Sequence, residues 1–92
     1  MTPDIRLSRT ALLHAAAAFR LGREAEASEE LVSIIDHLGR NLSSLPQQIL
    51  ADLAALLQQT FDAQARQDPI GVADLLEHEL LPKLLPTGLL ND

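Results

Sequence analysis

Apolar side chains recur three or four residues apart in four stretches of this 92-residue sequence, and glycine or proline stands between neighbouring stretches. The clearest of the four carries Ala27, Leu31, Ile34, Ile35, Leu38 and Leu42. Such spacing places the side chains on one face of an α-helix, whereas a half-buried strand would alternate apolar and polar residues. The pattern predicts an all-α protein, a small bundle of four antiparallel helices over residues 8–21, 24–40, 45–66 and 69–81, in a single domain spanning 1–92.

Composition favours the same fold class. Leucine and alanine supply most of the apolar residues, tryptophan and tyrosine are absent, and Phe19 and Phe61 are the only aromatic residues. Leucine and alanine are strong helix formers, whereas the β-branched and aromatic residues that favour strands are scarce. Because short loops make sequential helices antiparallel neighbours, we expect the first helix to pair with the second and the third with the fourth.

Local signals predict where the helices begin and end. Gly22 is expected to end the first helix in a left-handed conformation. Ser44 and Gln47 stand three residues apart, which is the spacing of a capping box at the start of the third helix. Asp68 is expected to be the N-cap of the fourth helix, with Pro69 at its first position. Pro82 lacks an amide hydrogen, so we expect the fourth helix to end or kink there.

Charge is unevenly distributed along a chain of net charge −6. The first 23 residues hold four arginines and one aspartate, whereas the rest hold twelve acidic and three basic residues. An acidic domain repels phosphate backbones, which disfavours a nucleic-acid partner. We expect the basic first helix to pack beside acidic neighbours. The alternative is a basic strip that binds an acidic partner.

Several classes of function find no support in the sequence. The chain has no cysteine, which excludes disulfides, thiolate metal sites and cysteine nucleophiles. No apolar run reaches the roughly 18 residues that span a bilayer, and the N-terminus lacks a signal-peptide pattern, so we expect a cytoplasmic protein without membrane contact. No acid, base and nucleophile stand in a recognisable arrangement, so we expect no enzyme activity and no cofactor.

The fourth stretch gathers the residues with chemical potential. Gly71 lies in its first turn, where glycine either lets the first helix approach closely, which we prefer, or leaves room for an anion or a partner backbone. Asp74, Glu77 and His78 share the polar side of this helix. They form a solvated face or an Asp–His hydrogen bond, and the alternative is a metal site.

The end of the chain raises two further questions. Glu79 falls near the apolar side of the fourth helix. It either reaches solvent at the edge of that side or, as we prefer, pairs with an arginine of the first helix and so fixes the helix register. The following segment, residues 80–90, contains Pro82, Leu84 and Leu85 and is too apolar for a free end. It must fold over the bundle, cover a second copy of the chain, or bind another protein.

Two resemblances bear on function. The pattern Asp68-x-Ile-Gly-x-Ala-Asp-x-Leu-Glu-x-Glu-Leu-x-Pro82 resembles a C-terminal segment of small uncharacterised bacterial helical proteins, which implies a bacterial origin and no particular activity. The stretch from Phe19 to Ile35 is similar to the helix–glycine–helix joins of flagellar export chaperones. Those are small acidic helical bundles that cover apolar segments of secreted subunits.

These observations favour a non-enzymatic protein–protein interaction module. We expect a homodimer that binds another protein through an apolar groove or through the C-terminal tail, with a secretion or flagellar chaperone-like adaptor as the most specific form of the hypothesis. The alternative is a protein that binds a small ligand or a metal ion at Asp74, Glu77 and His78.

Overall fold

The computed structural model describes residues 7–90, and in that part of the chain every regular element is helical. The first three helices are α1 (Arg9–Arg20), α2 (Glu24–Asn41) and α3 (Gln47–Ala65). The fourth is one continuous helix, here named the C-terminal helix, built from α4 (Pro69–Asp74), the π-helical turn η2 (Leu75–Leu80) and α5 (Leu81–Leu84). Short 3₁₀ turns, η1 (Leu42–Ser44) and η3 (Leu85–Thr87), follow α2 and α5. The prediction of an all-α bundle of four helices is confirmed.

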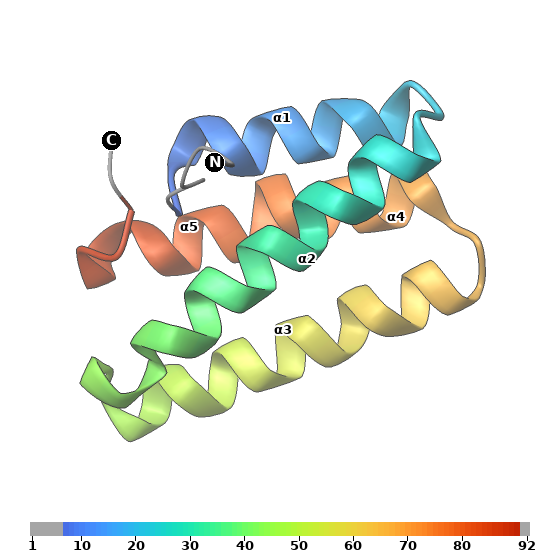
Figure 1. Cartoon of the computed structure of the whole chain (residues 1–92). Coiled ribbons are helices and arrows are strands. Elements are labelled where there is room, and N and C mark those ends of the chain that lie inside the picture. The colour runs from blue at the N-terminus through green and yellow to red at the C-terminus, as the bar shows by residue number, and fades with distance from the viewer. Residues whose placement is uncertain (1–6, 91–92) are drawn as a thin grey trace.

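The C-terminal helix is the central element of the bundle. It runs antiparallel to both α1 and α3, while α2 crosses obliquely in front of it from the end of α1 toward the start of α3 (Figure 1). Helix α1 packs against α2 and α4, and α3 packs against α4 and η2. Both expected pairs of sequential helices are therefore present, and a third pair, α1 with α4, closes the bundle.

A single apolar cluster holds the four helices together. Ala15 and Ala16 of α1 are both 0 % exposed, and their small side chains let neighbouring helices approach α1 closely. The larger buried side chains come mainly from three helices, and they include Leu12, Phe19, Leu31, Ile34, Leu38, Val72, Leu76, Leu80 and Leu84. Helix α3 contributes least, since Leu53 and Ala63 are its only buried apolar residues.

Two helices end in the same kind of turn, although only one has glycine. Gly22 follows α1 with φ of 75°, as expected, and Gln67 follows α3 with φ of 57°. At the second turn, the amide of Gln67 donates to the carbonyl of Gln64 at 3.0 Å and the amide of Asp68 donates to that of Ala63 at 2.9 Å. These are the two hydrogen bonds of a Schellman motif. They hold Gln67 in a conformation that non-glycine residues adopt at an energetic cost.

The capping box predicted for α3 is wrong. Ser44 belongs to η1, where its hydroxyl donates to the carbonyl of Asn41 at 2.8 Å. The N-cap of α3 is Pro46, which makes no side-chain capping hydrogen bond. The physical reason is that α2 continues into a 3₁₀ turn, so Ser44 satisfies a carbonyl at the end of α2 and is not available to α3.

Of the two outcomes expected at Pro82, a helix end or a kink, the helix end is wrong, because the C-terminal helix continues to Leu84. In a regular α-helix the proline ring would clash with the carbonyl four residues earlier. Here the amide of Leu81 donates to the carbonyl of Leu76, five residues back, whereas that of Leu85 donates to Leu81, four residues back. Pro82 stands where the hydrogen-bond register changes, and the wider π turn before it makes room for its ring.

The π turn also explains which leucines are buried. Val72, Leu76, Leu80 and Leu84 recur every four residues, and each is at most 1 % exposed. In an α-helix of 3.6 residues per turn, each step of four residues drifts by about 40° around the axis. A π turn takes more residues per turn and reverses this drift, so all four side chains stay on the core side.

Candidate functional site

The start of the C-terminal helix is fixed by Asp68, the predicted N-cap. Its carboxylate accepts a hydrogen bond from the amide of Gly71 at 3.0 Å. A Cβ atom added at Gly71 would lie 2.8 Å from Cγ of Asp68 and would clash with its Oδ2 atom. The nearest atoms thus belong to the capping side chain and not to α1, which replaces our interpretation that Gly71 serves close helix packing.

We therefore expect Gly71→Ala to displace the Asp68 carboxylate, at a cost of about 0.5–2 kcal/mol, the usual loss for an N-cap, against which the helix propensity of alanine returns at most about 1 kcal/mol. Gly39→Ala is the matched control, because Gly39 lies in α2 with no atom within 4 Å of an added Cβ. Alanine there should be neutral or stabilising by up to about 1 kcal/mol. Urea denaturation followed by circular dichroism measures both. If Gly71→Ala is as stable as Gly39→Ala, in which alanine replaces glycine in a helix without a cap contact, the cap can move without loss.

Asp74 and Glu77 bind an arginine of α1. Arg20 donates from Nη1 to Glu77 Oε1 at 2.6 Å and from Nη2 to Asp74 Oδ1 at 3.1 Å. The hydrogen bond to Glu77 and then that to Asp74 raise the pKa of the Arg20 guanidinium. The contact joins the end of α1 to the C-terminal helix, so the expectation that a basic first helix packs beside acidic neighbours is met at Arg20.

Glu79 was predicted to make this contact, and that assignment is wrong. Asp74 and Glu77 are three residues apart and share the side of the helix that faces α1, whereas Glu79 lies two residues further on and is exposed. The two elements that exchange an ion pair were predicted correctly, and the acidic partners were not.

His78 adds little to the Asp74 and Glu77 carboxylates. It is exposed, and its Nε2 atom lies 3.6 Å from Glu77 Oε2. The positive charge of Arg20 sits beside both carboxylates and opposes the binding of a cation. The prediction of a metal site at this face stays untested, and the geometry favours an ion-pair network there instead.

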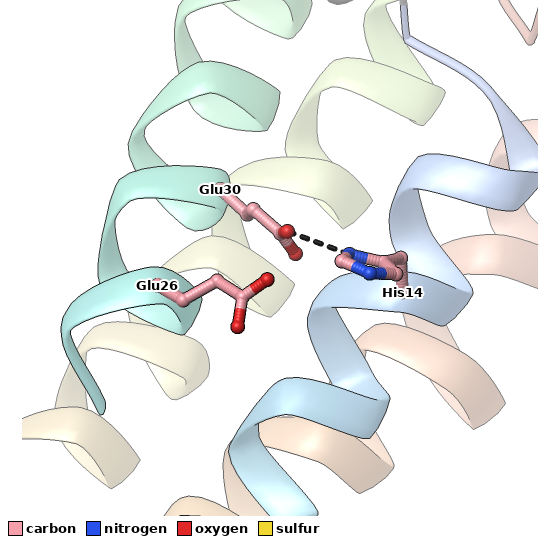
Figure 2. A group of neighbouring side chains, drawn as sticks. All are labelled: His14, Glu26 and Glu30. Atoms are coloured by element: carbon pink, nitrogen blue, oxygen red, sulfur yellow. Dashed lines mark hydrogen bonds and ion pairs between the residues drawn. The ribbon is translucent and has the colours of Figure 1, made fainter. Parts of the chain in front are cut away.

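A second polar cluster, which the sequence did not reveal, lies between α1 and α2. His14 Nδ1 lies 2.6 Å from Glu30 Oε1, and the potential ligand atoms of His14, Glu26 and Glu30 all lie within 4.8 Å of one another. In Figure 2 the His14 ring points at Glu30, and the Glu26 carboxylate faces the same gap. The spacing of Glu26 and Glu30, four residues on one helix, is visible in the sequence, whereas the approach of His14 depends on how α1 and α2 are aligned.

The C-terminal tail folds over the bundle, which was the first of the three arrangements considered. Leu84 is fully buried, and Leu89 and Leu90 pack against the core. The hydroxyl of Thr87 donates to the carbonyl of Leu84 at 2.6 Å and accepts from the amide of Leu89 at 3.2 Å. Leu85 points outward with 43 % of its surface exposed. Most of the apolar tail is therefore part of the core.

The fully exposed residues of α3 from Gln47 to Phe61 carry no charge, and the next residue, Asp62, is exposed and charged. The exposed residues of this segment are Gln47, Gln48, Ala51, Ala54, Ala55, Gln58, Gln59 and Phe61. Asp52 is the one charged residue in the segment, and it pairs with Lys83 at 3.1 Å. Leu50 and Leu57 are only half-buried on the same helix. We call Leu50, Ala54, Leu57 and Phe61 the α3 stripe, because their spacing of four, three and four residues places them on one side of the helix.

Comparison with known proteins gives no guide to function, since no protein-family model, curated protein or solved structure matches this chain. Among the described residues, no helix is both long enough and apolar enough to cross a lipid bilayer.

Proposed function

We propose that this chain is a non-enzymatic protein-binding module and that it pairs with a second copy of itself through the α3 stripe. The observation that carries the proposal is the run of uncharged, partly apolar exposed residues from Gln47 to Phe61 of α3, on a chain of net charge −6. Phe61 is 43 % exposed there, and α3 buries fewer apolar side chains than the other helices. An apolar strip rimmed by polar residues is typical of a protein-interaction surface.

The distribution of charge makes this surface the one where a second copy could bind with least repulsion. Two chains of net charge −6 repel each other, and the repulsion is weakest where the facing surfaces carry no charge. Glutamine and alanine are the exposed residues beside the α3 stripe from Gln47 to Phe61, so two copies can meet over that length without desolvating a carboxylate, and the exposed Asp62 lies at the end of the contact. Exposed Ala54 within the stripe and Ala51 at its edge allow close approach of the two helices.

The order of residues in the α3 stripe fits a twofold axis. In an antiparallel pair of α3 helices, Leu50 lies opposite Phe61 of the other copy, and Ala54 lies opposite Leu57. Each contact then occurs twice, as a symmetric dimer interface requires. The large residues stand at the ends of the stripe, and a small residue meets a larger one near the axis.

Light scattering on a sizing column tests the pairing, with an expected mass of about twice the 10.0 kDa of one chain. Phe61→Glu places a carboxylate in the apolar contact and should weaken dimerisation at least tenfold. Val32→Glu is the control, since Val32 is 65 % exposed on α2 and should keep the dimer. Circular dichroism confirms that both variants remain folded.

A charge swap tests the antiparallel register. Leu50→Lys combined with Phe61→Glu brings opposite charges together across the two copies, so the double variant should regain dimerisation that each single variant loses. The two positions are too far apart on one helix to pair within a chain. No recovery would rule out this register. A monomer at every concentration would overturn self-pairing and assign the α3 stripe to a different protein, as in the adaptor hypothesis derived from the export-chaperone resemblance.

A further inference from the structure

We propose that His14, Glu26 and Glu30 form a binding site for one divalent transition-metal ion, with Zn²⁺ as the representative ion. The site lies between α1 and α2 and is separate from the α3 stripe. Three ligand atoms from two helices lie within 4.8 Å of one another, which is close enough for a single ion to contact all three after small side-chain movements.

The second observation is an unsatisfied atom in the same cluster. Glu30 Oε2 is buried from solvent and has no hydrogen-bond partner, whereas Glu30 Oε1 lies 2.6 Å from Nδ1 of His14. A buried carboxylate oxygen without a partner is unfavourable, because it has lost water and gained nothing in return. A cation placed between the three side chains would satisfy this oxygen.

The kinds of ligand indicate the kind of ion. One imidazole nitrogen and two carboxylate oxygens suit Zn²⁺ and similar first-row ions, whereas Mg²⁺ prefers oxygen ligands alone. Two carboxylates balance the charge of a divalent ion when His14 is neutral. Three protein ligands also leave a fourth position for water, as in open zinc sites.

The arrangement is held by elements that do not depend on the metal. Glu26 and Glu30 are four residues apart in the first half of α2, so both carboxylates project toward α1. Glu26 also lies 3.6 Å from Arg23, an exposed contact that an ion would have to displace. Because the ligands come from both α1 and α2, a bound ion would link these helices and stabilise the folded chain.

Calorimetric titration of the full chain with Zn²⁺, in a buffer free of chelators, tests the site. We expect one ion per chain, a higher melting temperature with Zn²⁺ present, and much weaker binding of Mg²⁺. His14→Gln and Glu30→Gln should each weaken Zn²⁺ binding at least tenfold while leaving the helical content unchanged. His78→Gln is the matched control, because His78 lies beside Glu77 on the C-terminal helix and should not affect binding.

Three results would overturn the assignment. Absence of binding heat would mean that His14 and Glu30 form an ion pair only. Loss of binding in His78→Gln with full binding in His14→Gln would place the ion at Asp74, Glu77 and His78. Binding that survives all the substitutions would mean general attraction of Zn²⁺ to an acidic surface.

In a paramagnetic NMR experiment with Co²⁺, the ring signals of His14 should shift far more than those of His37 and His78.

Discussion

Leu76→Asp will leave the chain unfolded at room temperature. Leu76 is 0 % exposed and lies in η2, where the C-terminal helix packs against α1 and α3. Losing a buried leucine side chain costs about 2–5 kcal/mol. A buried, unpaired carboxylate adds several kcal/mol more. Their sum is comparable with the whole free energy of unfolding of a small domain, about 5–15 kcal/mol.

Circular dichroism and light scattering measure this outcome, and Ile70→Asp is its control on the same helix. Ile70 is 51 % exposed in the first turn, where a negative charge interacts favourably with the helix dipole. We expect Ile70→Asp to fold normally. A cooperative melting transition in Leu76→Asp close to that of the unsubstituted chain would contradict the core described for the C-terminal helix.

Truncation after Leu81 will produce the second-largest loss. It removes Leu84, which is fully buried, and the contacts of Leu89 and Leu90 with the core. It also removes the ion pair between Lys83 and Asp52. Full burial of one leucine contributes about 1.5–3 kcal/mol, so we expect the free energy of unfolding to fall by about 3–5 kcal/mol. The measurement is the midpoint of urea denaturation.

Two single substitutions locate the source of that loss. Leu84→Ala should cost about 2–5 kcal/mol, whereas Leu85→Ala, at a neighbouring position that is 43 % exposed, should cost much less. A truncated chain with an unchanged midpoint would mean that the tail adds nothing to the core and is free to bind a partner.

The elements of this fold could be predicted because their signals are local. Gly22 ends α1, and Asp68 with Pro69 begins the C-terminal helix, through contacts that reach at most a few residues along the chain. The mistakes at Ser44 and Pro82 have different causes. Ser44 could serve the helix before it or the one after it. At Pro82 the missing amide hydrogen predicts a helix end from local sterics, whereas the wider π turn that lets the helix continue is favoured by packing against other helices, which buries Val72, Leu76, Leu80 and Leu84 together.

For the contacts between helices, the sequence predicts which helices exchange an ion pair but not which residues form it. An ion pair between the first and fourth helices was expected, yet its acidic members depend on the rotation of one helix against the other, which selects Asp74 and Glu77 over Glu79. The approach of His14 to Glu30 depends likewise on the alignment of α1 with α2. The spacing of apolar residues defines the inner face of a helix. It does not determine how far the helix is shifted along its neighbour or how it is rotated against it.

In mechanical terms, η2 is a dislocation, one surplus residue in an otherwise regular lattice of hydrogen bonds. It is fixed at its C-terminal end by Pro82, which cannot donate a hydrogen bond, and near its N-terminal end by Arg20, which binds Asp74 just before the π turn and Glu77 within it. Removing the surplus residue would rotate every residue after the π turn about the helix axis, relative to the residues before it. One residue fewer in this turn would rotate Leu84 by about 100° and carry it away from the core. The number of residues between Asp74 and Pro82 is therefore as constrained as the identity of the buried side chains.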